Sequence, residues 1–153
     1  MKALIELVKN GYYFKKNFCN KSEFFSFADE FLHSKKVVDD RFLEMITNRE
    51  EQYPTGLVTM TIPVAIPHTD FEHVYKDSIL ICSFDESVPF RRMDNPDEEI
   101  KVELAIMLLI NKKEKHMDAL VDLMKLLQSP SLVKLKNAGT LEGCLKILEE
   151  DVK

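Results

Sequence analysis

The sequence predicts a single α/β domain in which helices cover a β-sheet, and three observations lead to this prediction. Helical and extended patterns alternate along the chain, which is typical of helices packed on a sheet. At least two extended runs are strongly apolar, residues 78–84 and 100–110. The length of 153 residues, 45% of them hydrophobic, suits one domain with a sizeable core. Because no repeat, low-complexity tract or linker interrupts the chain, residues 1–153 are expected to form one domain.

The first third of the chain predicts a strand and two helices. Between Lys2 and Phe18, alternation of aromatic and basic side chains from Tyr12 onward indicates an early strand. Apolar residues at helical spacing then predict a helix from Ser22, its expected N-cap, to about Ser34. A second helix is expected to follow Asp39 as its cap. It must end before Pro54, because proline disfavours helical geometry in the residue that precedes it.

The rest of the chain predicts further strands and a helical C-terminal part. After a turn at residues 54–56, extended runs are expected at residues 57–60, 64–66 and 78–84. Residues 100–110 are nearly all apolar and fit either a central strand or a buried helix, because periodicity alone cannot decide. Residues 116–128 predict a helix with Met117, Leu120, Val121, Met124 and Leu127 on one apolar face. Short helices are expected at residues 131–137 and 140–149.

Composition argues against several classes of protein. The net charge is -5, and no basic cluster is interleaved with aromatic residues, so nucleic acid is not an expected partner. The longest uncharged apolar run, Leu104 to Ile110, is far shorter than the roughly 20 residues that span a bilayer, and the N-terminus lacks the pattern of a signal peptide. We therefore expect a soluble, cytoplasmic protein. Its three widely spaced cysteines fit reduced structural thiols better than a disulfide framework or a zinc site.

The stretch TIPVAIPHTDFEHV, residues 61–74, contains the strongest candidate for chemistry. Pro63 and Pro67 bracket an apolar segment that carries His68 to the end of a predicted strand, where open α/β sheets tend to bind ligands. Thr69 and Asp70 follow, and both are suited to begin a turn or cap a short helix that aims backbone N–H groups at an anion. The pattern favours a functional role for His68.

The residues alone leave other roles for His68 open. It could be a structural histidine with satisfied hydrogen bonds. It could share a metal with Asp70 and His73, although the spacing fits no strong zinc signature and no H-E-x-x-H pattern is present. A serine or cysteine hydrolase is disfavoured because the chain has no G-x-S-x-G motif. We expect neither a metal nor another cofactor.

Four blocks of the sequence resemble a known family. The blocks are NREEQYPTGL, VAIPHTDFEHV, VPFRRMDNPDEEIKVELAIMLLI and HMDALVDLMKLLQ; they lie within residues 48–128, and the resemblance as a whole covers about residues 22–148. In order and spacing they resemble the enzyme IIA component of the sugar phosphotransferase system (PTS), within its fructose/mannitol-type superfamily and most like its galactitol-type branch. The resemblance implies a single α/β domain with a mixed, mostly parallel sheet flanked by helices on both faces. It also implies that residues 102–110 form a strand.

The resemblance further implies a phosphotransferase that works through a phosphohistidine. His68 would accept a phosphoryl group from the phosphocarrier protein HPr and pass it to the IIB component, which phosphorylates a sugar through the membrane-embedded IIC. Imidazole suits this role, because much of it is neutral and nucleophilic near pH 7. No metal or nucleotide is implied, since the phosphoryl group arrives from a protein.

Further site residues follow from the same resemblance. Arg49 matches the family's active-site arginine, although it could instead pair with Glu50 or Glu51 on a solvated helix end. His116 matches a second histidine near the phosphorylated one, although it could be an exposed first-turn residue. Thr69 and Asp70 are expected to orient the imidazole or to supply backbone donors to the phosphoryl group. His73 is expected to be structural or exposed, and Arg91 and Arg92 to lie on a loop that faces a partner or solvent.

An alternative function is a regulatory module, in which phosphorylation of His68 changes binding to another protein. A chain of 153 residues favours the transport component, because regulatory versions sit inside longer proteins. The sequence does not identify the sugar or the oligomeric state. The galactitol-type resemblance points to a polyol or a related hexose.

Overall fold

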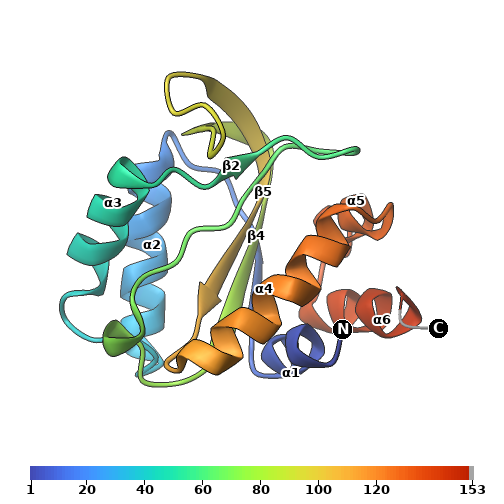
Figure 1. Ribbon diagram of the computed structural model, residues 1–153, viewed down its shortest axis with the longest axis horizontal. Helices are drawn as coiled ribbons and strands as arrows, with labels where there is room; N and C mark the ends of the chain where they lie inside the picture. Colours follow the sequence, from blue (N-terminus) through green and yellow to red (C-terminus); the bar gives the residue numbers. More distant parts are fainter. Residues whose placement is uncertain (152–153) are drawn as a thin grey trace.

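The computed structural model describes residues 1–151 and contains a five-stranded mixed sheet with helices on both faces (Figure 1). The elements in chain order are α1 (Lys2–Lys9), β1 (Tyr12–Lys15), α2 (Lys21–Ser34), α3 (Phe42–Gln52), β2 (Gly56–Leu57), β3 (Val64–Ala65), the 3-10 helix η1 (Phe71–His73), β4 (Ser78–Arg91), β5 (Glu99–Leu109), α4 (Lys113–Leu127), α5 (Ser131–Lys136) and α6 (Leu141–Asp151). The predicted α/β fold class is confirmed.

The strands are ordered β1-β4-β5-β3-β2, and parallel and antiparallel pairings occur in equal number, so the sheet is mixed as expected but not mostly parallel. β1 is parallel to β4 and β3 to β5, whereas the long β4–β5 pair and the short β2–β3 pair are antiparallel. The apolar segment at residues 100–110 is strand β5, as the resemblance implied. Its side chains alternate between two cores, which explains a nearly continuous apolar run: a strand covered on both faces needs apolar residues at every position.

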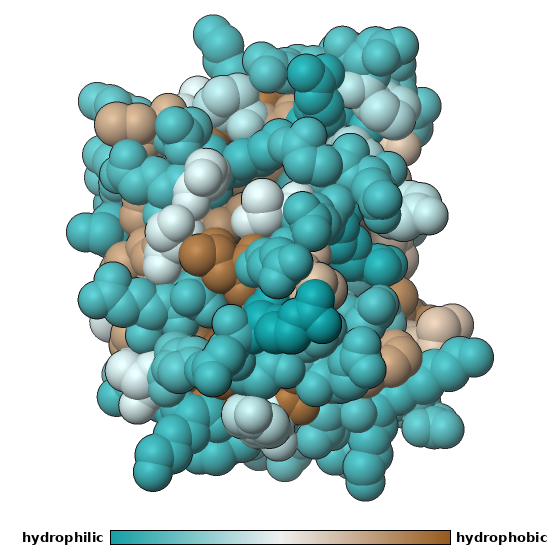
Figure 2. Space-filling view, turned by 90° about the vertical axis from the view of Figure 1, so that its left-hand side faces the viewer, coloured by the Kyte–Doolittle hydropathy of each residue, from teal (hydrophilic) through white to brown (hydrophobic). Residues whose placement is uncertain are grey.

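Each face of the sheet carries its own helical layer. α1, α4, α5 and α6 pack on one face with mainly aliphatic residues, whereas α2 and α3 pack on the other against a cluster rich in phenylalanine (Figure 1). The outer side of the molecule at α2 and α3 is mostly hydrophilic, with only small apolar areas at the surface (Figure 2). The layer of α2 and α3 is therefore amphipathic, as the helical spacing of its apolar residues predicts.

The N-terminal prediction was incomplete. The expected early strand exists as β1, but residues 2–9 before it form helix α1, which the sequence analysis missed. Leu4, Leu7 and Val8 have the spacing of one helical face and are buried. The N-cap of α2 is Asn20 rather than Ser22, since the Asn20 side chain accepts a hydrogen bond from the Glu23 backbone N–H at 2.9 Å.

The predicted boundaries of later elements needed smaller corrections. Asp39 does not cap α3 directly: its carboxylate accepts a hydrogen bond from the backbone N–H of Arg41, and the helix begins at Phe42. The helix ends at Gln52, before Pro54, as expected. Of the extended run predicted at residues 57–60, only Leu57 belongs to a strand, whereas β4 continues well beyond Phe84 to Arg91.

The helix predicted at residues 116–128 is confirmed as α4, but most of the face predicted to be apolar is exposed. Met117, Val121 and Met124 are 54%, 53% and 40% exposed. The buried residues of α4 are Ala119, Asp122, Leu123, Leu126 and Leu127. Apolar residues lie on both sides of this helix, so their spacing alone could not show which side meets the sheet.

The cysteines are unpaired, as expected. Cys82 and Cys144 are buried, and Cys19 is exposed. Burial raises the pKa of the Cys82 and Cys144 thiols to about 12, so both stay protonated and inert near neutral pH.

Candidate active site

His68 lies just beyond the end of β3, where the sequence analysis placed it. The backbone N–H of Leu108 in β5 donates to the carbonyl of Pro67 at 3.2 Å, which continues the pairing of β3 with β5 up to the residue before His68. Nδ1 of His68 lies 2.9 Å from the carbonyl oxygen of Ile66. Since a carbonyl can only accept, Nδ1 carries the proton and donates it. Nε2 therefore keeps its lone pair.

The surroundings of His68 favour the neutral imidazole. Burial lowers its pKa, and the nearby Arg49 guanidinium lowers it further. The hydrogen bond to Ile66 and the Asp70 carboxylate act in the opposite direction without reversing the shift. A neutral ring with a free nitrogen lone pair is a nucleophile near neutral pH.

His116 comes from the first turns of α4 and lies beside His68. The centroids of the two imidazole rings are 5.1 Å apart, and the ring of Phe71 meets His116 edge-on at 5.4 Å. Burial lowers the pKa of His116, and so do the neighbouring His68 and Arg49. Its Nε2 is buried and has no hydrogen-bond partner among residues 1–151. His116 is thus not the exposed first-turn residue of the alternative reading.

Arg49 lies in the last turn of α3 and extends toward the segment that follows His68. Its Nη1 is 3.3 Å from Oδ1 of Asp70, and its guanidinium carbon is 5.6 Å from the ring centroid of Tyr53. The segment between β2 and β4, green in Figure 1, runs between α3 and α4, so it brings His68 within reach of residues on both helices.

The alternative pairing of Arg49 with Glu50 or Glu51 is not seen in the described chain. Glu50 is only 3% exposed, and its two carboxylate oxygens accept hydrogen bonds from the backbone N–H and the hydroxyl of Thr55, at 2.7 and 2.8 Å. Glu51 instead lies 3.7 Å from the ammonium group of Lys21. The carboxylate that Arg49 does contact is that of Asp70.

Glu50 and Thr55 belong to a supporting network that the sequence analysis missed. The backbone N–H of Ile66 is shared between the carbonyl and the hydroxyl of Thr55, at 3.3 and 3.2 Å, and the Ile66 carbonyl in turn holds His68. A buried carboxylate on α3 is thereby linked to the position of His68. Burial raises the pKa of Glu50, while the Thr55 hydrogen bonds oppose that rise. The adjacency of Glu50 to Arg49 was visible in the sequence, but its burial was not.

Thr69 and Asp70 lie beside His68 in different environments. Thr69 is buried, and its hydroxyl donates to the backbone carbonyl of Asp70 at 3.1 Å. Asp70 precedes η1, but its side chain makes no capping hydrogen bond there. The contact that fixes the orientation of the His68 ring is the Ile66 carbonyl, whereas the Asp70 carboxylate contacts Arg49.

His73 is buried, and both of its ring nitrogens lie close to carboxylates. Its Nδ1 lies 3.0 Å from Asp39 and its Nε2 lies 3.4 Å from Glu72. Over residues 1–151, no group of three or more His, Cys, Asp or Glu side chains is arranged to hold a metal ion. These contacts give His73 a structural role in joining η1 to the segment before α3.

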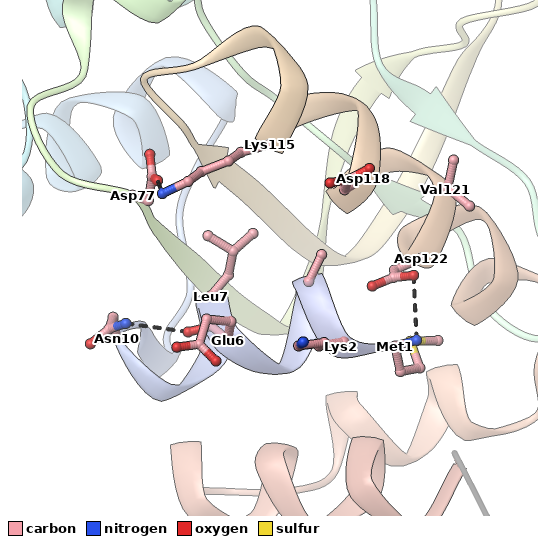
Figure 3. Close-up of a pocket in the computed structure, with 11 residues that line it drawn as sticks. Met1, Lys2, Glu6, Leu7, Asn10, Asp77, Lys115, Asp118, Val121 and Asp122 are labelled. Carbon is pink, nitrogen blue, oxygen red and sulfur yellow. Dashed lines mark hydrogen bonds and ion pairs between the residues drawn. The ribbon is translucent and has the colours of Figure 1, made fainter.

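Two other features lie apart from the site. A cavity of about 720 Å³ lies between α1 and α4, lined by residues such as Glu6, Lys115 and Asp118, and none of the predicted site residues lines it (Figure 3). Arg92 pairs with Asp94 and Glu98 in the β4–β5 turn.

No helix within residues 1–151 has the length and apolar character needed to cross a bilayer.

Comparison with known proteins gives consistent matches. The model of the family described as "Phosphoenolpyruvate-dependent sugar phosphotransferase system, EIIA 2" matches residues 7–151. The galactitol-specific EIIA component of the PTS from Escherichia coli K12 is 27% identical over 118 residues, which are 77% of this chain and 78% of that protein.

Solved structures share the fold. Enzyme IIAMTL of Escherichia coli, in its complex with phosphorylated enzyme IIBMTL, superposes with a TM-score of 0.71 at 21% identity, covering 91% of this chain and 94% of that one. The nitrogen regulatory protein IIA-Ntr of Neisseria meningitidis superposes with a TM-score of 0.68 at 24% identity, covering 94% and 97%.

Proposed function

The chain belongs to the EIIA 2 family of the phosphoenolpyruvate-dependent sugar phosphotransferase system, and from that premise we propose that it is a cytoplasmic phosphocarrier whose His68 receives a phosphoryl group from HPr. His68 then passes the group to a IIB component, which serves a membrane-embedded IIC. The observation that carries this proposal is the hydrogen bond from His68 Nδ1 to the Ile66 carbonyl, which leaves Nε2 as a free nucleophile beside Arg49 and His116.

Phosphoryl transfer from HPr to His68 exchanges one N–P bond for another and needs no cofactor. The lone pair on Nε2 of His68 forms a new N–P bond while the N–P bond to the donor's imidazole breaks, and the bonding pair stays on the donor nitrogen. Nδ1 keeps its proton throughout, because its acceptor is a backbone carbonyl. Transfer to IIB repeats the same exchange with this chain as the donor.

The neighbouring residues supply positioning and positive potential, which phosphoryl transfer needs more than covalent help. Arg49 can place its planar guanidinium on the phosphoryl oxygens. His116 has a buried, unpartnered Nε2 that can donate to one of them when it carries a proton. Thr69 shapes the turn after His68, and Asp70 orients the site through its contact with Arg49.

The decisive experiment is transfer of ³²P from phosphorylated HPr to the purified protein. Wild type should acquire an acid-labile, base-stable label at His68, whereas His68→Ala should acquire none while melting at the same temperature. A full-strength acid-labile label on His68→Ala, or no label on wild type, would overturn the proposal.

The choice of sugar should act through the IIB partner, since the site on this chain handles only the phosphoryl group. The galactitol-specific relative supports a polyol or a related hexose. We expect onward transfer from phosphorylated protein to be fastest with a galactitol-type IIB and at least tenfold slower with a mannitol-type IIB. Equal rates of onward transfer to the two IIB proteins would contradict the assignment to a polyol or a related hexose.

A regulatory module is the second candidate, because the fold is shared with a nitrogen regulatory protein. The two functions differ in the fate of the phosphoryl group. A transport component passes it to a IIB protein, whereas a regulatory module retains it and changes its binding partner. Failure of phosphorylated protein to label any IIB from the same genome would favour regulation.

A further inference from the structure

The ion pair between Arg49 and Asp70 places a negative charge where an anion is to be received. Asp70 follows His68 by two residues, and its carboxylate lies 3.3 Å from the guanidinium that we assign to the phosphoryl group. A purely structural role does not explain this carboxylate, since it makes no capping hydrogen bond to η1 and its side chain is 68% exposed.

The other nearby carboxylates are engaged elsewhere. Glu50 is buried and bound to Thr55, and Glu72 lies against His73. Both Arg49 and Asp70 influence the ionisation of His68, in opposite directions, so both charges lie close enough to act on the nucleophile. Asp70 is thus the carboxylate that shares the site with Arg49 in the part of the chain that the structure describes.

We propose that the Asp70 carboxylate is a temporary counter-ion of Arg49. It holds the Arg49 guanidinium over the site while His68 is unphosphorylated, and it releases the guanidinium when the phosphoryl group arrives. This role rests on the proposed function. It makes Asp70 a positioning residue with a thermodynamic effect: its charge opposes the phosphoryl charge and so limits how tightly the protein retains the group.

The exchange is physically reasonable in both states. Without the phosphoryl group, Asp70 and the ring of Tyr53 keep the guanidinium in place, so it need not be recruited from solvent. With it, the doubly charged phosphoryl oxygens offer Arg49 a bidentate contact that outcompetes an exposed, weakly bound carboxylate. The Asp70 carboxylate can then turn into water. Because its charge stays nearby, it raises the free energy of the phosphorylated form and favours onward transfer.

The test is the equilibrium of phosphoryl exchange with HPr, measured for wild type, Asp70→Asn and Glu72→Gln. Glu72 is the matched control, since it is an exposed carboxylate two residues further along that contacts His73 instead of Arg49. Asp70→Asn should shift the equilibrium toward the phosphorylated protein by about three- to tenfold, and the shift should shrink in high salt. Glu72→Gln should stay within twofold of wild type.

A second measurement, the titration of His68, separates the effect of the Asp70 charge from the effect of its side-chain shape. Because Asp70 raises the pKa of His68, Asp70→Asn should lower the His68 titration midpoint further, as followed by NMR, while Glu72→Gln should leave it in place. Melting temperatures of all three proteins should agree, since Asp70 is exposed.

Two results would overturn the inference. One is an Asp70→Asn equilibrium equal to wild type or shifted toward the unphosphorylated protein. The other is an equal shift in Glu72→Gln, which would indicate a general effect of net charge. If wild type accepts no phosphoryl group from HPr, the proposed function itself fails, which is a different outcome from normal phosphorylation without a shift in Asp70→Asn.

Discussion

At the scale of single residues, the backbone controls the reactivity of His68. The Ile66 carbonyl fixes which ring nitrogen carries the proton, and a carbonyl, unlike a carboxylate, does not titrate. Among the neutral forms of the ring, the tautomer with a free Nε2 should therefore be favoured at every pH at which the fold is intact. Burial and Arg49 then determine how far the pH must fall before Nε2 is protonated.

The first prediction concerns the pH dependence of phosphorylation. The pKa of His68 is lowered from its ordinary value of 6.5, so the neutral nucleophile persists as the pH falls through 6.5 and is lost only at lower pH. The His68 midpoint should be measured by NMR titration, beside single-turnover rates of phosphorylation. A midpoint at or above 6.5 would contradict the structure.

The second prediction concerns Arg49. Because Glu50 and Glu51 are engaged elsewhere and the Asp70 partner is exposed, Arg49 can exchange that carboxylate for the phosphoryl group, and a lysine would keep the charge but lose the planar fork. Arg49→Lys and Arg49→Ala should slow single-turnover transfer from HPr by about 10²–10³, the usual effect of losing one preorganised electrostatic contact. Thermal melts should be nearly unchanged, because exposed ion pairs are worth only about 0–1 kcal/mol. Transfer within about threefold of wild type for both variants would remove Arg49 from the site.

At the scale of secondary-structure elements, the network of Glu50, Thr55 and Ile66 joins the end of α3 to the end of β3. β3 has only two residues and would position His68 poorly by itself. Its parallel pairing with β5 holds one side of the segment, and Thr55 holds the other. The helix that carries Arg49 and the strand that leads to His68 are therefore fixed relative to each other.

The third prediction tests this connection. Thr55→Val removes the hydroxyl, leaving one buried Glu50 oxygen without a donor, which should cost about 1–3 kcal/mol in the free energy of unfolding. Transfer should also slow by about tenfold or more, because a small displacement of a reacting group is costly. Thr55→Ser is the matched control: it keeps the hydroxyl and loses one methyl group, worth about 0.8 kcal/mol. Urea unfolding and single-turnover transfer should be measured for both, and equal behaviour of the two variants would refute the role of the hydroxyl.

At the scale of the whole molecule, the central β4–β5 hairpin separates two hydrophobic cores. The residues of the candidate site lie on neither of these two strands. The strands of the hairpin are covered on both faces, so they form a rigid plane against which α3 and α4 are packed. The site is assembled beyond the C-terminal end of β3, from α3, the segment after β3, and the start of α4. Residues that lie together in the candidate site thus come from three separate parts of the chain.

The fourth prediction concerns metal ions. The donor is a protein, and Arg49 and His116 can meet the phosphoryl charge, so transfer between purified HPr and this protein should be unchanged by EDTA. Loss of transfer on adding EDTA, restored by zinc, would revive a metal site at His68, Asp70 and His73. The same experiment on His73→Gln would show whether His73 belongs to it.

The sequence by itself determined many local features of this protein, although it did not reveal helix α1. Pro63 and Pro67 bounded the segment that delivers His68 to a strand end, and helical spacing identified α2, α3 and α4. These predictions succeeded because they depend on residues close together in the chain. The order and spacing of four blocks also identified the family, and the match over residues 7–151 confirmed it.

Only the tertiary structure decided which residues meet. It buried Glu50 against Thr55, paired Arg49 with Asp70 and brought His116 beside His68. It also selected the side of α4 that faces the sheet, leaving Met117, Val121 and Met124 exposed. The physical reason is that periodicity describes one element at a time, whereas burial and side-chain contacts depend on how separate elements pack against each other.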